Sequence, residues 1–418
     1  MTTAPGSLPG SPPPPAADHH GQRVLILGAS LLQVPMIRRA RDLGMRPVVV
    51  DMDPAAPGVC LAEEFHAVST NDIDTVLDVA RAHDIHGVAT VGTDMPVRTI
   101  AAVAQALGLP GVSPTTALTC TDKAVMAQAF ADASLPHPAF RTVSGMAELE
   151  EAVAQIGLPC ILKPLDSSGS RGVIQVSSAD QLPTALDYTR RVTRDVSPSG
   201  QVLVEELLTG PEISCEVLCI AGTAHVVALT DKATTGAPHF IETGHTQPAV
   251  LDAPTTAAVT SLVQDTVEAT GITDGPAHIE MILTSTGPRL VELGARMAGD
   301  FVASHLVPLT TGVDFIGLVL RQACGEPIDP PMPRPQGGAV RFLDAPQGTL
   351  VSFRGLTQAH GLPGVREVLP LARAGQRIGG LHSSTDRVGV VIAQGKDHDD
   401  AARICEAARN LITVEVQP

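Results

Sequence analysis

The sequence predicts a protein of mixed α/β and α+β class built from three structured parts. Strand-like and helical stretches alternate from Arg23 to about residue 115, which is typical of a small parallel sheet. The next stretch mixes helices with strands that pair locally, and the Pro-rich segment 327–338 separates it from a shorter, strand-rich remainder. A chain of 418 residues is long enough for two or three such domains. We therefore expect domains at 22–115, 116–328 and 329–418.

The composition excludes several classes of function. The net charge is −16, and the chain has no tryptophan and one tyrosine. Nucleic acid and anionic membranes repel an acidic chain, and few aromatic rings are present to stack on bases. No apolar run reaches the ~18 residues of a membrane-spanning helix. We therefore expect small-molecule partners, with no nucleic acid and no membrane among them.

The first residues and the cysteines both bear on location. Residues 1–21 contain six prolines in the first fifteen positions, which predicts a disordered lead-in. This segment lacks the basic start and the apolar stretch of a secretory signal. The seven cysteines are scattered and form no CxxC pair, so they are expected to be reduced core residues. These features favour a cytoplasmic protein.

The N-terminal part is expected to hold one parallel sheet. Its first strand ends at Gly28, but the GxGxxG spacing of a dinucleotide-binding loop is missing, since only one glycine is present. The sequence therefore disfavours NAD or FAD binding at this point. The expected strands are 23–28, 47–53 and 87–92, and the expected helices are 34–44 and 72–85.

The central part is expected to begin with helix and to continue with strands. Segment 113–138 predicts a helix with Ser113 or Thr121 as its N-cap and Pro136 as its end. A polar segment, 231–249, follows further on. The other expected strands are 160–163, 172–176, 202–208 and 213–220, and the helices are 147–157, 179–195, 255–271 and, finishing the C-terminal part, 398–410.

A predicted hairpin carries two facing carboxylates. Apolar residues recur at every second position of 278–283 and 289–296, and Thr284 to Pro288 between them predict a five-residue loop. Such a loop places Glu280 opposite Glu292. Carboxylates roughly 4.5–5.5 Å apart across a sheet repel each other, and a divalent cation bound by oxygen ligands offsets the repulsion. The hairpin alone leaves two interpretations open, a metal site and a surface hairpin with solvated carboxylates.

The two faces of this hairpin are predicted to differ. The face expected to pack on the core carries Ile279, Met281, Leu283, Val291 and Leu293. The opposite face carries His278, Glu280, Glu292 and Arg296, together with Ile282 and Leu290.

A lysine followed by a glycine-rich loop predicts a phosphate site. Lys163 ends an apolar strand, and the loop 166–172, DSSGSRG, follows it. Backbone N–H groups and hydroxyls with little side-chain bulk suit a polyphosphate, although the GxxxxGK[ST] pattern of a P-loop is absent. Taken alone, the loop is also explained as an ordinary turn, and Lys123 as a solvated lysine. Beside the hairpin, however, the loop favours the metal-site interpretation.

Together these segments resemble the ATP-grasp superfamily over nearly the whole chain from about residue 23. The resemblance implies an ATP-grasp fold with an N-terminal Rossmann-like (pre-ATP-grasp) domain and a small C-terminal β-rich lobe. It also implies a lid subdomain at about 140–210 that closes over ATP.

The resemblance implies a role for each matching residue. Lys123, Lys163 and the loop residues Ser168, Gly169, Ser170 and Gly172 correspond to phosphate-binding positions. Glu205, Glu206 and Leu207 correspond to the strand that pairs with adenine, and Glu212 to the acid that holds the ribose. Glu280 and Glu292 correspond to the magnesium carboxylates, and Arg296 to the arginine that steadies the substrate carboxylate and acyl-phosphate.

Within the superfamily, the chain is similar to carboxylate–amine ligases, which include bacterial L-amino-acid (dipeptide) ligases. The similarity rests on segments 242–248, 294–302 and 383–395. One position departs from the pattern, because the family often has Asn two residues after the second magnesium carboxylate, where this chain has Gly294. Either water or substrate then completes the second magnesium shell, or that ion binds more weakly.

The resemblance implies an ATP-dependent ligase that forms an amide or peptide bond through an acyl-phosphate and releases ADP and phosphate. The expected cofactors are ATP and two Mg²⁺ ions, with Mn²⁺ as a substitute. Glu242 and His245 lie in the polar segment and are candidates to meet a substrate amino group. His245 is also a candidate to deprotonate the attacking amine, since histidine titrates near neutral pH. A structural loop with a hydrogen-bonded histidine explains the same residues.

Three rival functions remain to be distinguished. A biotin carboxylase is disfavoured because its cluster of basic residues and glutamines is missing after Glu212. A purine-pathway ligase needs a second basic loop for a ribose phosphate, and none is evident. A non-catalytic ATP-binding module would not require both Glu280 and Glu292. Similar ligases are often dimers, so a homodimer is expected.

Overall fold

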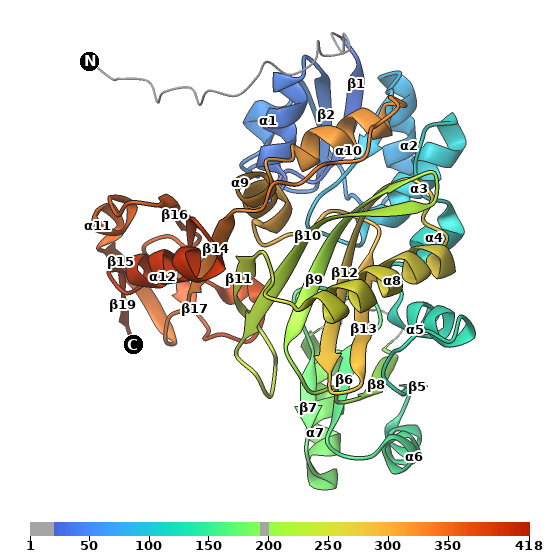
Figure 1. Cartoon of the computed structure of the whole chain (residues 1–418), viewed down its shortest axis with the longest axis vertical. Coiled ribbons are helices and arrows are strands. Elements are labelled where there is room, and N and C mark those ends of the chain that lie inside the picture. Colours follow the sequence, from blue (N-terminus) through green and yellow to red (C-terminus); the bar gives the residue numbers. More distant parts are fainter. Residues whose placement is uncertain (1–20, 193–199) are drawn as a thin grey trace.

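The computed structural model describes residues 21–192 and 200–418. Apart from Gly21, the predicted lead-in 1–21 lies outside these residues, as do the last residues of the helix predicted at 179–195. Figure 1 shows the N-terminal strands in blue at the top, a green unit around β6 and β7 at the bottom, and the C-terminal lobe in red to one side.

The N-terminal strands form the parallel sheet that the sequence predicts, in the order β3-β2-β1-β4. Strand β1 is buried on both faces because its side chains alternate between two cores, one with α1 and one with α2 and α3. The elements are β1 (Arg23–Leu27), α1 (Val34–Asp42), β2 (Arg46–Asp51), β3 (Glu64–Ala67), α2 (Ile73–Ala82), β4 (Gly87–Ala89) and α3 (Pro96–Leu107).

The segment 113–138 forms two helices, so the prediction of one continuous helix is wrong. Ser113 caps α4 (Pro114–Thr119), as expected, but the second cap is Asp122 instead of Thr121. The Asp122 carboxylate accepts hydrogen bonds from two backbone N–H groups of the next turn and thereby starts α5 (Lys123–Asp132). That helix ends four residues before Pro136. The new start makes Lys123 the first residue of a helix.

A separate antiparallel sheet carries the glycine-rich loop. Its strand order is β5-β8-β6-β7, and it has a small core of its own with two helices. The loop connects β6 to β7, as the sequence predicts. The elements are β5 (Phe140–Val143), α6 (Met146–Ile156), β6 (Cys160–Pro164), β7 (Ile174–Val176), α7 (Leu182–Val192) and β8 (Val202–Glu206). We refer to this unit as the lid sheet.

The largest sheet has eight strands in the order β13-β12-β9-β10-β11-β14-β18-β16, and α8 packs on one of its faces (Figure 1). Much of the polar segment 231–249 lies in two of these strands, where the sequence suggested a loop. The elements are β9 (Glu212–Ile220), β10 (Thr223–Thr234), β11 (Glu242–Gln247), α8 (Ala253–Thr270), β12 (Gly275–Thr284), β13 (Gly287–Gly294), β14 (Gly337–Leu343), β16 (Val365–Pro370) and β18 (Gly389–Gly395).

The rest of the chain joins these units together. The helices α9 (Val307–Thr311) and α10 (Phe315–Ala323) bury apolar residues against α1 and the N-terminal sheet. A three-stranded sheet, β15 (Gly348–Arg354), β17 (Arg377–Ile378) and β19 (Thr413–Gln417), completes the C-terminal lobe with α11 (Leu356–His360) and α12 (His398–Arg409). Because β19 follows α12, the prediction that a helix finishes the lobe is wrong. The large sheet contains strands from both sides of the predicted boundary after residue 328. The predicted domain limits stay predictions.

Within the described ranges 21–192 and 200–418, none of the helices is by itself long and apolar enough to span a membrane. By length and composition alone, the bent pair Val302–Thr311 and Phe315–Ala323 passes the same test when taken together.

Candidate active site

Most of the predicted nucleotide residues line one cavity of about 170 Å³ between the lid sheet and the hairpin β12–β13. Gly172 is the predicted residue that does not line it, and its carbonyl oxygen accepts a hydrogen bond from Thr189 on α7. The lining includes Lys123, Lys163, Ser168, Gly169, Ser170, Glu205, Glu206, Leu207, Glu212, Glu242, Glu280, Glu292 and Arg296.

The glycine-rich loop is held in place by contacts on two sides. Gly169, Ser170 and Gly172 have φ values of 67°, 57° and 78°, which let the chain wind tightly between β6 and β7. The Ser170 hydroxyl donates to the carbonyl oxygen of Phe240 at 3.1 Å. The Ser384 amide of the C-terminal lobe donates to the Gly169 carbonyl oxygen at 3.1 Å. The loop therefore bridges the lid sheet and the C-terminal lobe.

Both predicted phosphate lysines are buried and paired with carboxylates. The Lys163 ammonium lies 2.7 Å from Glu205, and both side chains are less than 10% exposed (6% and 8%). The Lys123 ammonium lies 2.9 Å from Glu292 and donates to the Ser167 carbonyl oxygen at 2.5 Å. Burial lowers the pKa of Lys123, but the nearby carboxylates, Glu292 foremost, together raise it by more, so that it lies above its ordinary value. Neither lysine is therefore the solvated surface lysine of the rival interpretation.

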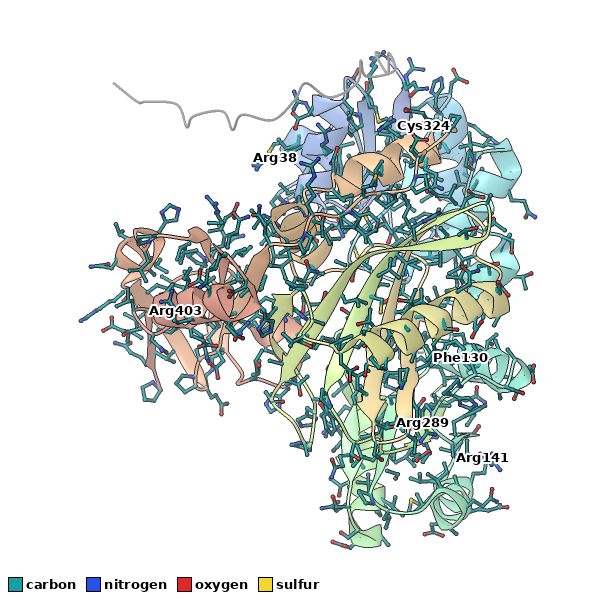
Figure 2. The ribbon with its side chains drawn as sticks, viewed as in Figure 1. Arg38, Phe130, Arg141, Arg289, Cys324 and Arg403 are labelled. Atoms are coloured by element: carbon teal, nitrogen blue, oxygen red, sulfur yellow. The ribbon has the colours of Figure 1, made fainter. Side chains whose placement is uncertain are left out.

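Glu206 is predicted to lie beside adenine, and its carboxylate is already engaged. Arg289 donates to both of its oxygens, at 3.0 and 2.9 Å, and the amide of Ala139 donates at 3.1 Å. Figure 2 labels Arg289 near the base of β13, beside the lid sheet. This pairing lowers the pKa of Glu206, mainly through the hydrogen bond from Arg289. Any contact of Glu206 with adenine would therefore be made by its backbone.

The hairpin places Glu280 directly opposite Glu292, as the sequence predicts. The predicted five-residue loop is wrong, because β12 ends at Thr284 and β13 begins at Gly287. A β-bulge next to Glu280 shifts the register by one residue and restores the pairing.

The same bulge reverses the predicted faces of two neighbouring residues. Leu290 is fully buried in the core, whereas Val291 lines the cavity. The other predicted core residues of the hairpin lie on the expected side: Ile279, Met281, Leu283 and Leu293.

Lys232 is a central residue of the site that the sequence analysis did not identify. Its ammonium lies 2.6 Å from Glu212, 3.0 Å from Glu280 and 3.7 Å from Glu242, and its side chain is 3% exposed. Burial lowers the pKa of Lys232, but these carboxylates raise it well above its ordinary value. Burial also raises the pKa of Glu212, to which Glu280 and Glu242 add, although Lys232 opposes the shift. One ammonium is thus shared by three carboxylates.

His278 links Glu280 to the interior of the large sheet. Its Nδ1 lies 2.6 Å from the fully buried Glu216, and its Nε2 lies 3.0 Å from Glu280. Burial lowers the pKa of His278, but the carboxylate of Glu216 and the two hydrogen bonds raise it to about 9. Burial likewise raises the pKa of Glu280, but Lys232 and His278 together hold it well below its ordinary value. We therefore assign the charged imidazolium to His278 at neutral pH.

This charge predicts a loss of stability at alkaline pH. The pKa of His278 is about 9 in the folded protein against an ordinary 6.5, so its protonation stabilises the fold fully below pH 6.5. That contribution disappears as the pH rises through 9. Relative to His278→Asn, the wild type should lose about 3 kcal/mol of unfolding free energy over this range. Denaturant unfolding at a series of pH values measures the difference, with the exposed His360→Asn as the matched control. A difference that does not change with pH would show that His278 is neutral.

Arg296 lies between the hairpin and the N-terminal domain. Its guanidinium donates bidentate hydrogen bonds to the Asp94 carboxylate, at 2.8 and 3.2 Å. Gly294 is explained by the same contact, because a Cβ at this position would lie 2.8 Å from the Asp94 carboxylate and 3.1 Å from the Arg296 Nε. The asparagine that the family often has at this position would therefore collide with the Asp94–Arg296 pair.

The substitution Gly294→Asn should accordingly be destabilising. Overpacking of this kind costs about 1–3 kcal/mol, and the displaced guanidinium of Arg296 should also reduce turnover. Denaturant unfolding and a steady-state assay measure the two effects. Gly145→Asn is the control, since a Cβ at Gly145 meets no atom within 4 Å. A Gly294→Asn variant as stable as the wild type would contradict the explanation.

A second and larger cavity of about 460 Å³ adjoins the first. Glu242, Glu280 and Arg296 line both cavities, so the two form one continuous site. Apolar residues contribute one part of its wall: Leu31, Leu32, Phe301, Val302, Phe342 and Leu371.

His245 lies in this second cavity beside a charged pair. Its Nε2 is 3.4 Å from Asp300, which also accepts hydrogen bonds from Arg387 at 2.5 and 2.7 Å. The His245 side chain is 5% exposed, and its Nδ1 is buried without a hydrogen-bond partner among the described residues. Asp300 has a φ of 52°, a strained value of the kind found at functional sites. The rival interpretation placed His245 in a structural loop. In the structure His245 lies in strand β11, and one of its ring nitrogens, Nδ1, has no hydrogen-bond partner among the described residues.

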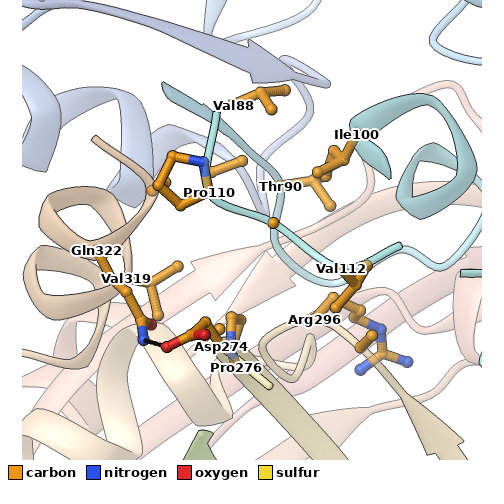
Figure 3. Close-up of a pocket in the computed structure, with 15 residues that line it drawn as sticks. Val88, Thr90, Ile100, Pro110, Val112, Asp274, Pro276, Arg296, Val319 and Gln322 are labelled. Atoms are coloured by element: carbon orange, nitrogen blue, oxygen red, sulfur yellow. Dashed lines mark hydrogen bonds between the residues drawn. The ribbon is translucent and has the colours of Figure 1, made fainter. Parts of the chain in front are cut away.

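A third, smaller cavity of about 60 Å³ lies between the N-terminal domain and the large sheet (Figure 3). Gln322 donates to the Asp274 carboxylate at 3.4 Å, and its own carbonyl oxygen is buried without a partner in the described part of the chain. The wall of the cavity is mostly apolar, and Gln322 and Asp274 supply its polar groups together with Thr90 and Arg296. We assign no substrate to this cavity.

Comparisons with known proteins identify the same family as the sequence motifs that form the site. Residues 156–304 match the ATP-grasp domain model, and residues 341–417 match the model of L-amino acid ligase C-terminal domain 2. The uncharacterized protein y4rH of Sinorhizobium fredii is 30% identical over 91% of this chain and 80% of its own length. Human carnosine synthase 1 is 26% identical over 77% of this chain, which spans 42% of that protein.

The fold likewise matches a solved ligase. The crystal structure of an L-amino acid ligase from Bacillus licheniformis aligns with a TM-score of 0.83 at 23% identity, covering 96% of this chain and all of the other. Similarity also extends to a purine-pathway enzyme, the formate-dependent phosphoribosylglycinamide formyltransferase of Burkholderia lata, at 26% identity over 95% of both chains.

The chain therefore belongs to the ATP-grasp family and is an ATP-binding ligase. Within that family it is a carboxylate–amine, C–N bond-forming enzyme that resembles the L-amino acid ligases.

Proposed function

We propose that the protein uses ATP to join the carboxylate of an amino acid to an amine or to a second amino acid. The continuity of the two cavities carries this proposal. The first presents lysines and a glycine-rich loop suited to a polyphosphate, and the second has room for two small reactants. Arg296 and Glu280 line both, so reacting groups from either side can meet there.

The nucleotide would lie between the lid sheet and the hairpin β12–β13. Lys123, Lys163 and the loop 166–172 would hold its phosphates, and Glu212 its ribose hydroxyls. In the structure each lysine is paired with a carboxylate, so the nucleotide would exchange those partners for phosphate oxygens. The contacts of the loop with Phe240 and Ser384 place it where it would exclude water.

Glu280 and Glu292 fit a site for Mg²⁺. Magnesium binds through one or two carboxylates and completes its shell with phosphates and water. The two carboxylates face each other across the hairpin, and the described residues hold no cluster of three or more metal-ligating side chains. When bound, such ions neutralise the charge that develops on the transferred phosphoryl group. Two ions are proposed, with Mn²⁺ as a substitute.

The proposed reaction has two steps. An oxygen of the substrate carboxylate attacks the γ-phosphorus of ATP, forming an acyl-phosphate while the bond to ADP breaks. The nitrogen of the amine then attacks the acyl carbon, phosphate leaves and the nitrogen loses a proton. Arg296 suits the binding of the carboxylate and of the acyl-phosphate because its planar guanidinium donates two parallel hydrogen bonds.

Glu242 and His245 are proposed to receive the amine. The Glu242 carboxylate accepts a hydrogen bond from the Ser384 hydroxyl at 2.5 Å, which orients it in the second cavity. His245 is proposed to accept the proton of the amine, since it lines the same cavity and its buried Nδ1 has no hydrogen-bond partner among the described residues.

Phosphate release from Mg-ATP across a matrix of paired amino acids tests the proposal, with mass spectrometry of the products. Release that requires both partners, with a product lighter by one water than their sum, is the expected result. Release with bicarbonate or with a ribose-phosphate amine would instead favour the biotin carboxylase or purine-pathway alternative. Binding of ATP without turnover for any pair would favour a non-catalytic module.

Two further expectations stay predictions from the sequence. A homodimer is tested by light scattering coupled to size-exclusion chromatography. A cytoplasmic location is tested by fractionating cells that express the full chain.

A further inference from the structure

The environment of Lys232 joins three parts of the site to which the proposed function gives different roles. Glu212 is proposed to bind the ribose hydroxyls, Glu280 to bind magnesium, and Glu242 to bind the substrate amine. Lys232 contacts all three from β10, the strand that lies between β9 and β11 in the large sheet. Its side chain is 3% exposed, so the ammonium is largely shielded from bulk water and its contacts are mainly with these carboxylates.

We propose that Lys232 is a positioning residue with two successive contacts. Before metal binds, its ammonium pairs with Glu280 in place of the metal ion. After metal binds, it pairs with Glu242 and orients that carboxylate. This inference rests on the proposed function. Lys232 acts through the carboxylates around it and is not assigned to the reacting atoms.

The charges explain why Lys232 and a divalent cation would compete. Three carboxylates face two cations, the ammonium of Lys232 and the imidazolium of His278, so the group still carries an excess of negative charge with Lys232 in place. The shared ammonium lies 3.0 Å from Glu280, within the distance at which a second cation next to the same carboxylate is repelled. A bound metal ion would therefore weaken the contact of Lys232 with Glu280, and a missing Lys232 would strengthen metal binding.

The same geometry links the metal to the amine position. If Glu212 binds the ribose and Glu280 binds the metal, Glu242 is the carboxylate that remains to pair with Lys232. The Glu242 carboxylate lies 3.7 Å from the Lys232 ammonium in the structure. A closer approach of the two would hold the Glu242 carboxylate oriented toward the second cavity. We therefore expect the amine to bind well only after the nucleotide and the metal.

Removing the charge of Lys232 should thus have two opposite effects. In Lys232→Met, Mn²⁺ alone should bind nucleotide-free protein at least threefold more tightly, as measured from the electron paramagnetic resonance signal of free Mn²⁺. The KM for the amine should rise at least tenfold while the KM for ATP changes less. A purely structural lysine would not produce tighter metal binding. Lys396→Met, which removes an 80% exposed lysine, should change neither quantity.

Unchanged or weaker Mn²⁺ binding by folded Lys232→Met would overturn the proposal. If that variant does not fold, Lys232→Arg carries the test, because its guanidinium keeps the charge but changes the geometry. The arginine variant should then bind Mn²⁺ as the wild type does and show at least a threefold higher amine KM, and an unchanged KM would overturn the proposal. A wild type that ligates no amine would contradict the proposed function, while the Mn²⁺ measurement would still report on Lys232.

Discussion

Replacing Glu292 by glutamine should abolish turnover and leave the melting temperature within a few degrees of the wild type. The amide keeps the shape of the side chain and can still accept a hydrogen bond from Lys123, which lies 2.9 Å away and also donates to the Ser167 carbonyl oxygen. Because Glu292 is 25% exposed, against 8% for Glu205, the lost charge should cost less stability here than at the pair of Lys163 and Glu205. The amide loses the charge that is proposed to hold a divalent cation, and electrostatic groups at an active site contribute about 100- to 1000-fold to turnover. Phosphate release and thermal unfolding, measured on the same preparation, separate the two effects.

A matched control for this change is Glu326→Gln. Glu326 pairs with Arg321 at the end of α10, far from the hairpin in the chain, so its replacement should leave turnover intact. If Glu292→Gln instead unfolded the protein, the facing carboxylates would be structural. If it retained turnover, the proposed role of the hairpin in metal binding would be wrong.

Lys163→Met should reduce both stability and nucleotide binding. The change leaves the Glu205 carboxylate, 8% exposed, without its counter-charge, and breaking a buried pair in this way costs about 3–5 kcal/mol. It also removes a proposed phosphate contact. Urea unfolding and titration with a fluorescent ATP analogue measure the two losses. The exposed pair of Arg46 and Glu63 is the control, because Arg46→Met should leave the stability nearly unchanged.

The double variant Lys163→Met/Glu205→Leu separates the two effects. Removing both charges should recover most of the lost stability, since an apolar pair can replace a buried ion pair. Nucleotide binding should remain weak, because the phosphate contact is still missing. Recovery of nucleotide affinity along with stability would show that Lys163 acts only through the fold.

Local patterns predicted the parts of the site that lie close together in the sequence. The alternation of apolar residues on either side of the predicted loop 284–288 indicated the pairing of Glu280 with Glu292, although the bulge that restores the register left no signal. The apolar strand before the glycine-rich loop likewise placed Lys163 correctly. The second helix start at Asp122 was missed because Thr121 and Asp122 are both good caps, and only the structure shows which one is used.

The residues that were missed act through contacts between distant segments. Lys232 lies in a stretch whose polar composition suggested a loop, and its strand is recognisable only from its pairing with β9 and β11. Asp94 reaches Arg296 across 202 residues, and Arg387 reaches Asp300 across 87. No short-range periodicity reports such pairs. The apolar run 226–229 just before Lys232 was the signal available.

The most direct test of the proposed acyl-phosphate is the fate of a carboxylate oxygen. A substrate amino acid labelled with ¹⁸O in its carboxylate should transfer one labelled oxygen to the released phosphate in each turnover, because phosphate leaves with the oxygen that attacked ATP. Mass spectrometry of the phosphate measures this transfer. Unlabelled phosphate, or label appearing in AMP, would show that the carboxylate is not activated by phosphoryl transfer and would contradict the proposed mechanism.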